Sequence, residues 1–391
     1  MKLVIRKFSR LISHMDKKLL ITTIILFTFG LLNIVTASSR ESINYDYPLY
    51  YYFYQQIKIL FAGVIVSLII LNIDTKDYKK WAILAFLAIG GMLIYLSLTG
   101  DFKRGSQNWL VLPVIGSVQP SEFAKPVIIV CLALLFEAFY YKLRDKKINH
   151  YDMIAIILAV GLVFPLIIFF QKDFGTMFII LCIFGGMFLA SPILRSEKFK
   201  TILLLLGLGI CMLFIIVVVG KKDVLSLEQL DRFNFFNPCS NYEEGGYQTC
   251  NGFIAINDGG LFGLGIGKSK QKYSYIPEPH TDSVFAIITE ECGLLWDIVI
   301  FILWIIVIKQ ILNLASKANT IRGRYICLGV AIYIFMHIFI NLGGLFGLIP
   351  LTGVPLPFLS YGGSFTLSLI VSLAVIQRIH IETDKKVKGV K

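Results

Sequence analysis

The chain of 391 residues is 56% hydrophobic and only 16% charged, and its mean hydropathy is +0.74. These values lie far from the averages of soluble globular proteins and are typical of a polytopic membrane protein. The formal net charge of +12 is explained by basic segments that face anionic inner-leaflet lipid. It therefore gives no reason to propose a nucleic-acid partner, and the lack of a Walker motif argues against ATP hydrolysis.

Apolar segments recur near the length of about 20 residues that a helix needs to cross the bilayer. Ten of them lie at roughly 19–38, 57–73, 81–99, 121–141, 153–170, 175–194, 201–220, 282–308, 325–348 and 360–379. Lys and Arg concentrate on the side of both termini, so the positive-inside rule places both termini in the cytoplasm. The first apolar run exceeds that of a signal peptide, and we expect it to stay as a span. We predict an all-α polytopic membrane protein that forms one domain over residues 1–391, with ten transmembrane helices.

One extracellular loop is long, at residues 221–281 between the seventh and eighth predicted spans. Loops longer than about 15 residues usually either carry function or are disordered. The apolar stretch GLFGLGIG within this loop favours a folded structure on the membrane surface. Cys239 and Cys250 share the loop, so a disulfide between them and two free thiols both stay open.

The stretch GLIPLTGVPLPFLSYGGS, between the ninth and tenth spans, combines prolines and glycines near membrane depth. It contains Pro350, Pro355, Pro357 and the pair Gly362–Gly363. Irregular backbone at that depth is tolerated only where it is buried in protein or lines a wet cavity. We therefore predict a cavity on the outer side of the membrane, with an ordinary proline-rich connector as the alternative.

Acidic residues gather where the long loop meets the eighth predicted span, in a region where ionised groups are costly. Asp282 either caps the helix or acts as a general base whose pKa is tuned by burial. Glu290 and Glu291 follow two helical turns later. Because they are adjacent they point in different directions, and we expect both to make structural polar contacts between helices.

Cationic residues offer two interpretations on the fourth predicted span. Glu122 and Lys125 are three residues apart on one helix face, so they can simply neutralise each other. Alternatively, Lys125 supplies positive charge to an anionic group such as a diphosphate, together with Arg104 and with the loop lysines Lys268, Lys270 and Lys272. Asp173 stands at an outside helix start, where capping is the simplest role.

Five stretches resemble the SEDS family (shape, elongation, division and sporulation), in the same order and over nearly the whole chain. They are RGSQNWL, QPSEFAK, QKDFGT, GYQTCNGFIAINDGGLFGLGIGKSKQKYSYIPEPHTD and GLIPLTGVPLPFLSYGGS. Members of that family are ten-helix peptidoglycan glycosyltransferases that polymerise lipid II, a lipid-linked disaccharide pentapeptide. They do so at the outer face of the bacterial cytoplasmic membrane, alongside a class B penicillin-binding transpeptidase. The resemblance therefore implies these partners, other divisome proteins, and a multi-pass protein of that membrane with an outward-facing site.

Within the family, the spacing around Lys268 to Lys272 looks like the division and sporulation branch, FtsW and SpoVE, more than the elongation branch, RodA. Three departures stand out. Lys172 replaces the usual proline, Ser283–Val284 replaces Phe-Ile, and Asn257–Asp258 replaces Gly-Ser. None of them removes the acidic residue expected to be catalytic, which maps onto Asp282.

The resemblance implies a single inverting displacement, in which Asp282 takes the proton of the attacking GlcNAc 4-hydroxyl and cations stabilise the departing diphosphate. The expected substrate-binding residues are Arg104, Lys125, Lys268, Lys270, Lys272, Glu278, His280, Ser360 and Gly362. The expected cavity-forming residues are Trp109, Pro120, Ser121, Glu122, Asp173, Pro355 and Pro357. A divalent cation, Mg²⁺ or Mn²⁺, stays open, because no paired-carboxylate site clearly provides for one. A lipid II flippase and an elongation polymerase are the alternative functions.

Overall fold

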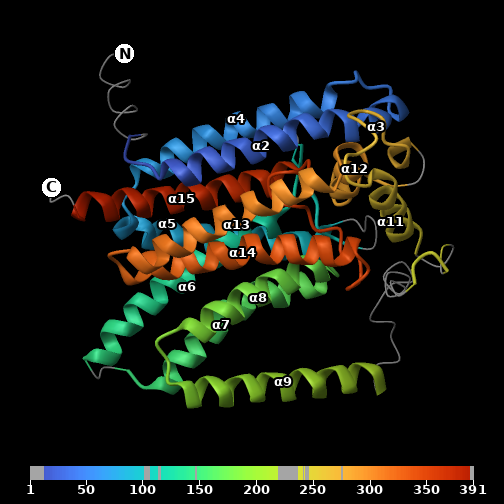
Figure 1. Ribbon diagram of the computed structural model, residues 1–391. Helices are drawn as coiled ribbons and strands as arrows, with labels where there is room; N and C mark the ends of the chain where they lie inside the picture. Colours follow the sequence, from blue (N-terminus) through green and yellow to red (C-terminus); the bar gives the residue numbers. More distant parts are fainter. Residues whose placement is uncertain are drawn as a thin grey trace.

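The computed structural model describes residues 13–100, 106–112, 116–145, 148–218, 237–240, 242, 246–273 and 276–387. Long helices run lengthwise through the molecule (Figure 1). Their bounds are α2 (Lys17–Ala37), α4 (Tyr51–Asn72), α5 (Tyr78–Thr99), α6 (Pro120–Arg144), α7 (His150–Phe170), α8 (Phe174–Ala190), α9 (Arg195–Val218), α13 (Leu294–Lys317), α14 (Ile321–Leu345) and α15 (Gly363–Val387). The short elements are α3 (Ser39–Asn44), η1 (Thr75–Asp77), α11 (Tyr247–Gly259), η3 (Gln271–Tyr273) and α12 (Val284–Cys292), with an antiparallel hairpin of β1 (Leu110–Leu112) and β2 (Gly116–Val118).

The prediction of an all-α polytopic membrane protein is confirmed. Each of the ten predicted segments overlaps a helix, and eight helices of the described part are long and apolar enough to cross a membrane. The apolar helix α8 is shorter, at 17 residues. The start of α2 and the end of α15 lie at the same end of the bundle, on the left of Figure 1. This arrangement agrees with the expectation that both termini face one side of the membrane.

The eighth predicted span, 282–308, is wrong as one continuous helix. The structure divides it into the short α12 and the membrane-length α13, which meet at Gly293. Gly293 has φ +83°, a conformation that residues with a side chain rarely adopt. After the break, the Leu294 N–H donates to the Gly260 carbonyl at 3.0 Å. Glu290 and Glu291 therefore lie in a short outer helix rather than in a membrane-spanning one.

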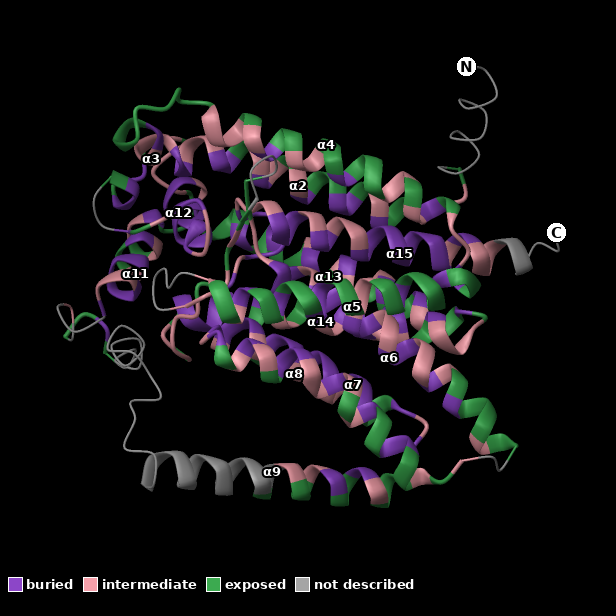
Figure 2. Ribbon diagram, turned by 180° about the vertical axis from the view of Figure 1, so that it is seen from behind, coloured by how far each residue is buried: buried purple, intermediate pink, exposed green. Residues whose placement is uncertain are grey.

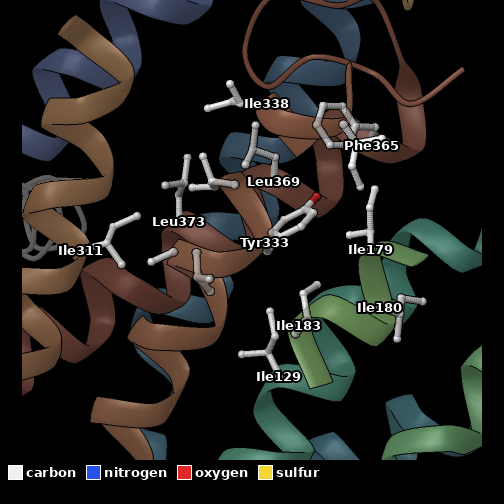
Figure 3. Packing of buried hydrophobic residues seen from close by; sticks show 14 of the residues in the cluster. Ile129, Ile179, Ile180, Ile183, Ile311, Tyr333, Ile338, Phe365, Leu369 and Leu373 are labelled. Carbon is white, nitrogen blue, oxygen red and sulfur yellow. The ribbon is translucent and has the colours of Figure 1, made fainter. Parts of the chain in front are cut away.

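The core of the bundle is built around α14 and α15, the two most buried of the apolar helices. Figure 3 shows Tyr333 of α14 among Ile129 of α6, Ile183 of α8 and Leu369 of α15, all of them buried. In contrast, few residues of α4 and α5 are buried, and Figure 2 shows α4 mostly in the colours of exposed and intermediate residues. An exposed apolar face is what a helix in contact with lipid needs, because lipid tails are as apolar as the side chains.

The described part of the long loop is folded. Helix α11 packs against α12 and α14, and a disulfide between Cys239 and Cys250 ties the preceding turn to α11. The disulfide that the sequence left open is therefore formed in the structure. Residues 221–236 of the loop lie outside the described residues. In GLFGLGIG, Phe262 and Ile266 are each 78% exposed, which suits a segment that rests on the membrane surface.

Candidate active site

A cavity of about 1870 Å³ lies between α4, α5, α6, α15 and the start of α8. One end of the cavity is lined by residues that the chain brings together from the β-hairpin, the α7–α8 turn, the end of the long loop and the loop before α15. The polar lining includes Asn108, Gln119, Glu122, Lys172, Asp173, Glu278, Thr281, Asp282, Thr352 and Ser364. A cavity is thus present, and the proline-rich stretch lines it through residues 349–355.

The rest of the cavity is apolar and runs deep along the bundle. Its lining on α5 reaches from Tyr78 to Met92, which corresponds to about 21 Å of helix at 1.5 Å per residue. Val127 and Val130 of α6 and Val371 of α15 face the same space. The cavity therefore joins a polar outer end to a long apolar channel, an arrangement that suits an amphiphile with a bulky polar head.

Asp282 lies at the polar end, just before α12, and lines the cavity beside Glu278. Its carboxylate oxygen Oδ1 is 3.4 Å from the Thr281 hydroxyl and 3.5 Å from both Gln248 Nε2 and the Ser283 hydroxyl. Contacts of that length are weak hydrogen bonds. The capping residue of α12 is Ser283, not Asp282. The carboxylate is therefore available to the cavity, and capping does not account for it.

The backbone around Asp282 is held more firmly than its side chain. Asn341 on α14 donates from Nδ2 to the carbonyl oxygens of Asp282 and Val354, at 2.7 Å in each case. Gly353, with φ +69°, brings backbone close to the Asp282 carboxylate. A single amide thus fixes both the loop that carries Asp282 and the proline-rich loop that faces it.

The environment of Asp282 tunes its acidity. Burial raises the pKa of the Asp282 carboxyl from 3.8 to about 6, and the negative charge of Glu278 adds to this rise. A carboxyl group with a pKa near 6 is ionised at neutral pH, yet it binds a proton far more readily than an ordinary aspartate. That combination is what a general base requires.

His280 does not line the cavity. Its ring is buried between two tyrosines, with ring centroids 4.6 Å from Tyr52 and 5.4 Å from Tyr361. The His280 carbonyl accepts a hydrogen bond from the Tyr361 N–H at 2.8 Å. His280 therefore joins the end of the long loop to the loop before α15, and the structure gives no support to the expected contact with substrate.

Lys125 is fully buried in α6 and does not line the cavity. Its Nζ atom lies 2.7 Å from Glu122 Oε1 and 3.0 Å from His337 Nε2. An ammonium group only donates, so His337 accepts through Nε2 and its Nδ1–H donates to the Pro355 carbonyl at 3.1 Å. Of the two interpretations, the structure therefore favours neutralisation by Glu122. Lys125 supports the cavity wall through its contacts with Glu122 and His337.

The loop lysines differ from one another. Lys272 is buried and pairs with Glu291 at 2.8 Å, whereas Lys268 and Lys270 are exposed and lie outside the cavity lining. Glu290 accepts hydrogen bonds from the Ser269 hydroxyl and from the Lys270 N–H. The expected structural role of both glutamates holds, although they bind the loop rather than another helix. The expectation that Lys272 faces phosphate is wrong, because its ammonium group is buried in an ion pair with Glu291.

A substitution can separate these roles. We expect Lys272→Met to loosen the loop, since it leaves Glu291 buried without its cation. Lys268→Met and Lys270→Met should leave the loop unchanged, because both side chains are exposed. Limited proteolysis of the purified variants measures the effect as the rate of cleavage within 246–273. Equal cleavage rates for all three variants would contradict the assignment.

Asp173 acts as the predicted cap of α8, and its carboxylate also connects three segments of the cavity wall. Its Oδ1 accepts from the Thr176 N–H at 3.1 Å, while Oδ2 accepts from Asn108 at 3.2 Å and from Gln119 at 3.1 Å. These bonds tie α8 to the β-hairpin and to the start of α6. Trp109, which the sequence also indicated, lines the cavity from the hairpin.

The remaining expected residues divide into lining and supporting positions. Pro120, Pro355 and Gly362 line the cavity. Ser121 is buried in α6, Pro357 is not part of the lining, and Ser360 accepts a hydrogen bond from the Leu356 N–H at 2.7 Å. Arg104 lies outside the described residues. Among the described residues, no group of three or more His, Cys, Asp or Glu side chains could hold a metal ion, and the divalent cation stays a prediction.

Several site residues were not found from the sequence. Gln248 and Asn341 contact Asp282 from α11 and α14, and neither stands out in its local pattern. An asparagine inside an apolar span was the available signal for Asn341, because polar groups within spans are costly. Lys172, noted only as a departure from the family pattern, lines the cavity.

Comparison with known proteins identifies the relatives of the chain. Residues 17–385 match the family model FtsW/RodA/SpoVE, described as cell cycle protein. The chain is 33% identical to the probable peptidoglycan glycosyltransferase FtsW of Bacillus subtilis (strain 168), covering 95% of this chain and 91% of that protein. It is 32% identical to the stage V sporulation protein E of the same organism, with coverages of 93% and 96%.

Solved structures share the fold. A chain from a structure on the coordination of polymerization and crosslinking by a peptidoglycan synthase complex has a TM-score of 0.72 at 20% identity, covering 94% of this chain and 98% of that one. RodA of Thermus thermophilus has a TM-score of 0.66 at 20% identity, with coverages of 94% and 96%. The family match over nearly the whole chain and the identities above 30% lead to one conclusion: the chain belongs to the FtsW/RodA/SpoVE family, the SEDS peptidoglycan glycosyltransferases.

Proposed function

We propose that this family member polymerises lipid II into β-1,4 glycan strands, with Asp282 as the general base. The observation that carries the proposal is one continuous cavity. Its polar end holds a carboxyl group with a pKa of about 6, and the rest of its length is apolar. Lipid II combines a charged sugar head with an isoprenoid tail, and each half matches one end of this cavity.

The chemistry follows from the stereochemistry of substrate and product. In lipid II the sugar C1 is α-linked to a diphosphate, whereas the polymer is β-linked, so one displacement inverts the centre. The GlcNAc 4-oxygen forms a bond to C1 while the bond from C1 to the diphosphate oxygen breaks. The diphosphate leaves with the electron pair, and the 4-hydroxyl proton passes to Asp282. One base on the acceptor side is sufficient, and the place of Asp282 in the cavity lining together with its raised pKa supports that role.

The apolar channel gives the lipid tail a place during the reaction. The lining residues on α4, α5 and α15, and those from Phe123 to Val130 on α6, include no charged side chain. Keeping the tail in an apolar environment holds the diphosphate at the junction of channel and polar end. Binding energy from the unreactive tail then positions the reacting atoms, a known source of rate enhancement.

The cellular setting is inferred from the relatives. Similarity to FtsW and to the stage V sporulation protein E supports a role in division or sporulation, with elongation as the alternative. The likeness to a chain of a peptidoglycan synthase complex supports a class B penicillin-binding transpeptidase as partner. We infer that the polar end faces the outside of the cytoplasmic membrane, because the basic residues concentrate on the side of the termini.

The decisive experiment is polymerisation of purified lipid II by the purified protein with its cognate transpeptidase. Glycan strands resolved on a gel, from the wild type but not from an Asp282→Asn variant, are the expected result. A lipid II transporter would instead move lipid II across proteoliposome membranes without forming polymer. Transport without strands would overturn the proposal.

The pH dependence provides a second check. Asp282 must be ionised to act as a base, so the rate should fall as the pH drops through about 6. Glu278→Gln removes the neighbouring negative charge that raises the Asp282 pKa, so this fall should move to lower pH. Glu278→Asp keeps the charge and is the matched control. An unchanged acid limb in Glu278→Gln would show that another group limits the rate.

A further inference from the structure

The charges that line the cavity pose a problem for an anionic substrate. Among the described lining residues, four carry carboxylates, at Glu122, Asp173, Glu278 and Asp282. Lys125 balances Glu122 from behind the wall. The diphosphate of lipid II would enter this acidic surrounding, and its departure needs positive charge close by. The lysines expected for this task are either buried in ion pairs or outside the lining.

Lys172 is the cationic residue of the described lining. Its neighbours in the sequence, Gln171 and Asp173, are both held in place by hydrogen bonds. Gln171 donates from Nε2 to the Leu93 carbonyl at 2.8 Å and to the Ser97 hydroxyl at 3.1 Å, and Asp173 caps α8. The turn between α7 and α8 is thus fixed on both sides of Lys172.

The backbone at Lys172 is strained. Its φ is +57°, in the left-handed region, which costs a residue with a side chain of order 1–3 kcal/mol and persists only where the surroundings impose it. The Lys172 N–H still donates to the Phe169 carbonyl at 3.0 Å. Strain of this kind clusters at functional sites, and here it belongs to a residue that lines the cavity.

Lys172 also lies at the junction where a diphosphate must sit. On one side, Gln171 binds α5 at Leu93, next to Met92 at the start of the apolar channel. On the other side, Gly175 packs closely against Thr352, in the loop that approaches Asp282. In lipid II the diphosphate joins the isoprenoid tail to the reacting sugar, so a tail in the channel and a sugar at Asp282 bring the diphosphate to this turn.

We propose that Lys172 binds the diphosphate of the prenyl-linked substrate and stabilises it as it departs. The proposal rests on the proposed function and names the cation of that site.

The test measures binding apart from polymerisation. Farnesyl diphosphate, as a soluble prenyl diphosphate, is titrated into the full-length protein in nanodiscs by calorimetry. Lys172→Gln should weaken its affinity by roughly 10- to 100-fold, the usual effect of losing a charged hydrogen bond, while Lys172→Arg should keep most of the affinity. Lys58→Gln is the matched control, because Lys58 is exposed on α4 next to the lining residue Ile59.

A second variant guards against loss by misfolding. Lys172→Gly removes the ammonium group but adopts the left-handed backbone without strain, so it should fold at least as well and lose affinity like Lys172→Gln. Wild-type affinity in both variants would overturn the proposal, as would an equal loss in Lys58→Gln or a wild type that does not bind the probe. The proposed function is judged separately, by strand formation from lipid II in the wild type and in Asp282→Asn. The role of Lys172 and the proposed polymerase function can therefore be refuted independently of each other.

Discussion

Asp282→Asn is expected to lower the rate of lipid II polymerisation by about 10²–10⁴-fold, the usual loss when a general base is removed. Asparagine keeps the size of the side chain and its contacts with Gln248 and Thr281, but it cannot accept the proton of the attacking hydroxyl. The measurement is initial rate at equal protein amounts, with gel-resolved strands as product. A rate near that of the wild type would remove Asp282 from the mechanism.

The Asp282→Asn variant should be no less stable than the wild type, and the raised pKa of Asp282 is the reason. The folded pKa of Asp282, about 6, is above the ordinary value of 3.8, so the protonated form favours the folded state. That contribution is complete below pH 3.8 and is lost as the pH rises through 6. At neutral pH the folded protein therefore carries an unfavourable buried charge, which asparagine removes. We expect an unfolding temperature at or above that of the wild type, which separates lost catalysis from lost folding.

Lys125→Ala is expected to destabilise the folded protein by about 3–5 kcal/mol, because it leaves Glu122 buried without a cation. Both side chains are almost fully buried, at 0% and 2% exposure, and their charged atoms are 2.7 Å apart. The substitution also removes the donor to His337, whose ring in turn holds the Pro355 carbonyl at the cavity wall. Denaturant unfolding in detergent measures the loss.

The matched control removes both charges. A Glu122→Leu/Lys125→Leu double variant should recover most of the lost stability, since two apolar side chains leave no buried charge unpaired. Because Glu122 lines the cavity, stability and not activity is the readout. A double variant as unstable as Lys125→Ala would show that the pair contributes through specific hydrogen bonds rather than through mutual neutralisation.

The sequence by itself determined the helical membrane class of the fold and indicated Asp282 as a candidate site residue. Hydropathy is a local property of about 20 consecutive residues, so α2, α4 and α7 could be located without knowledge of their neighbours. Asp282 was recognisable because an ionisable residue next to a predicted span is costly and needs a reason. The proline- and glycine-rich stretch before α15 likewise indicated a cavity, because irregular backbone near membrane depth needs protein or water around it.

Only the tertiary structure decided what each charge does. Lys125, Lys272 and Lys172 look alike in the sequence, yet one is bound to Glu122, one to Glu291, and one lines the cavity. Lys272 and Glu291 are 19 residues apart, and backbone hydrogen bonds from Leu264 to Glu290 and from Gly265 to Glu291 hold the loop against the end of α12. The partner of Lys125 is three residues away on its own helix, whereas the partner of Lys272 comes from a different segment, and burial makes each pairing energetically important. The local pattern identifies the charged residues, and the packing of remote helices and loops assigns their partners.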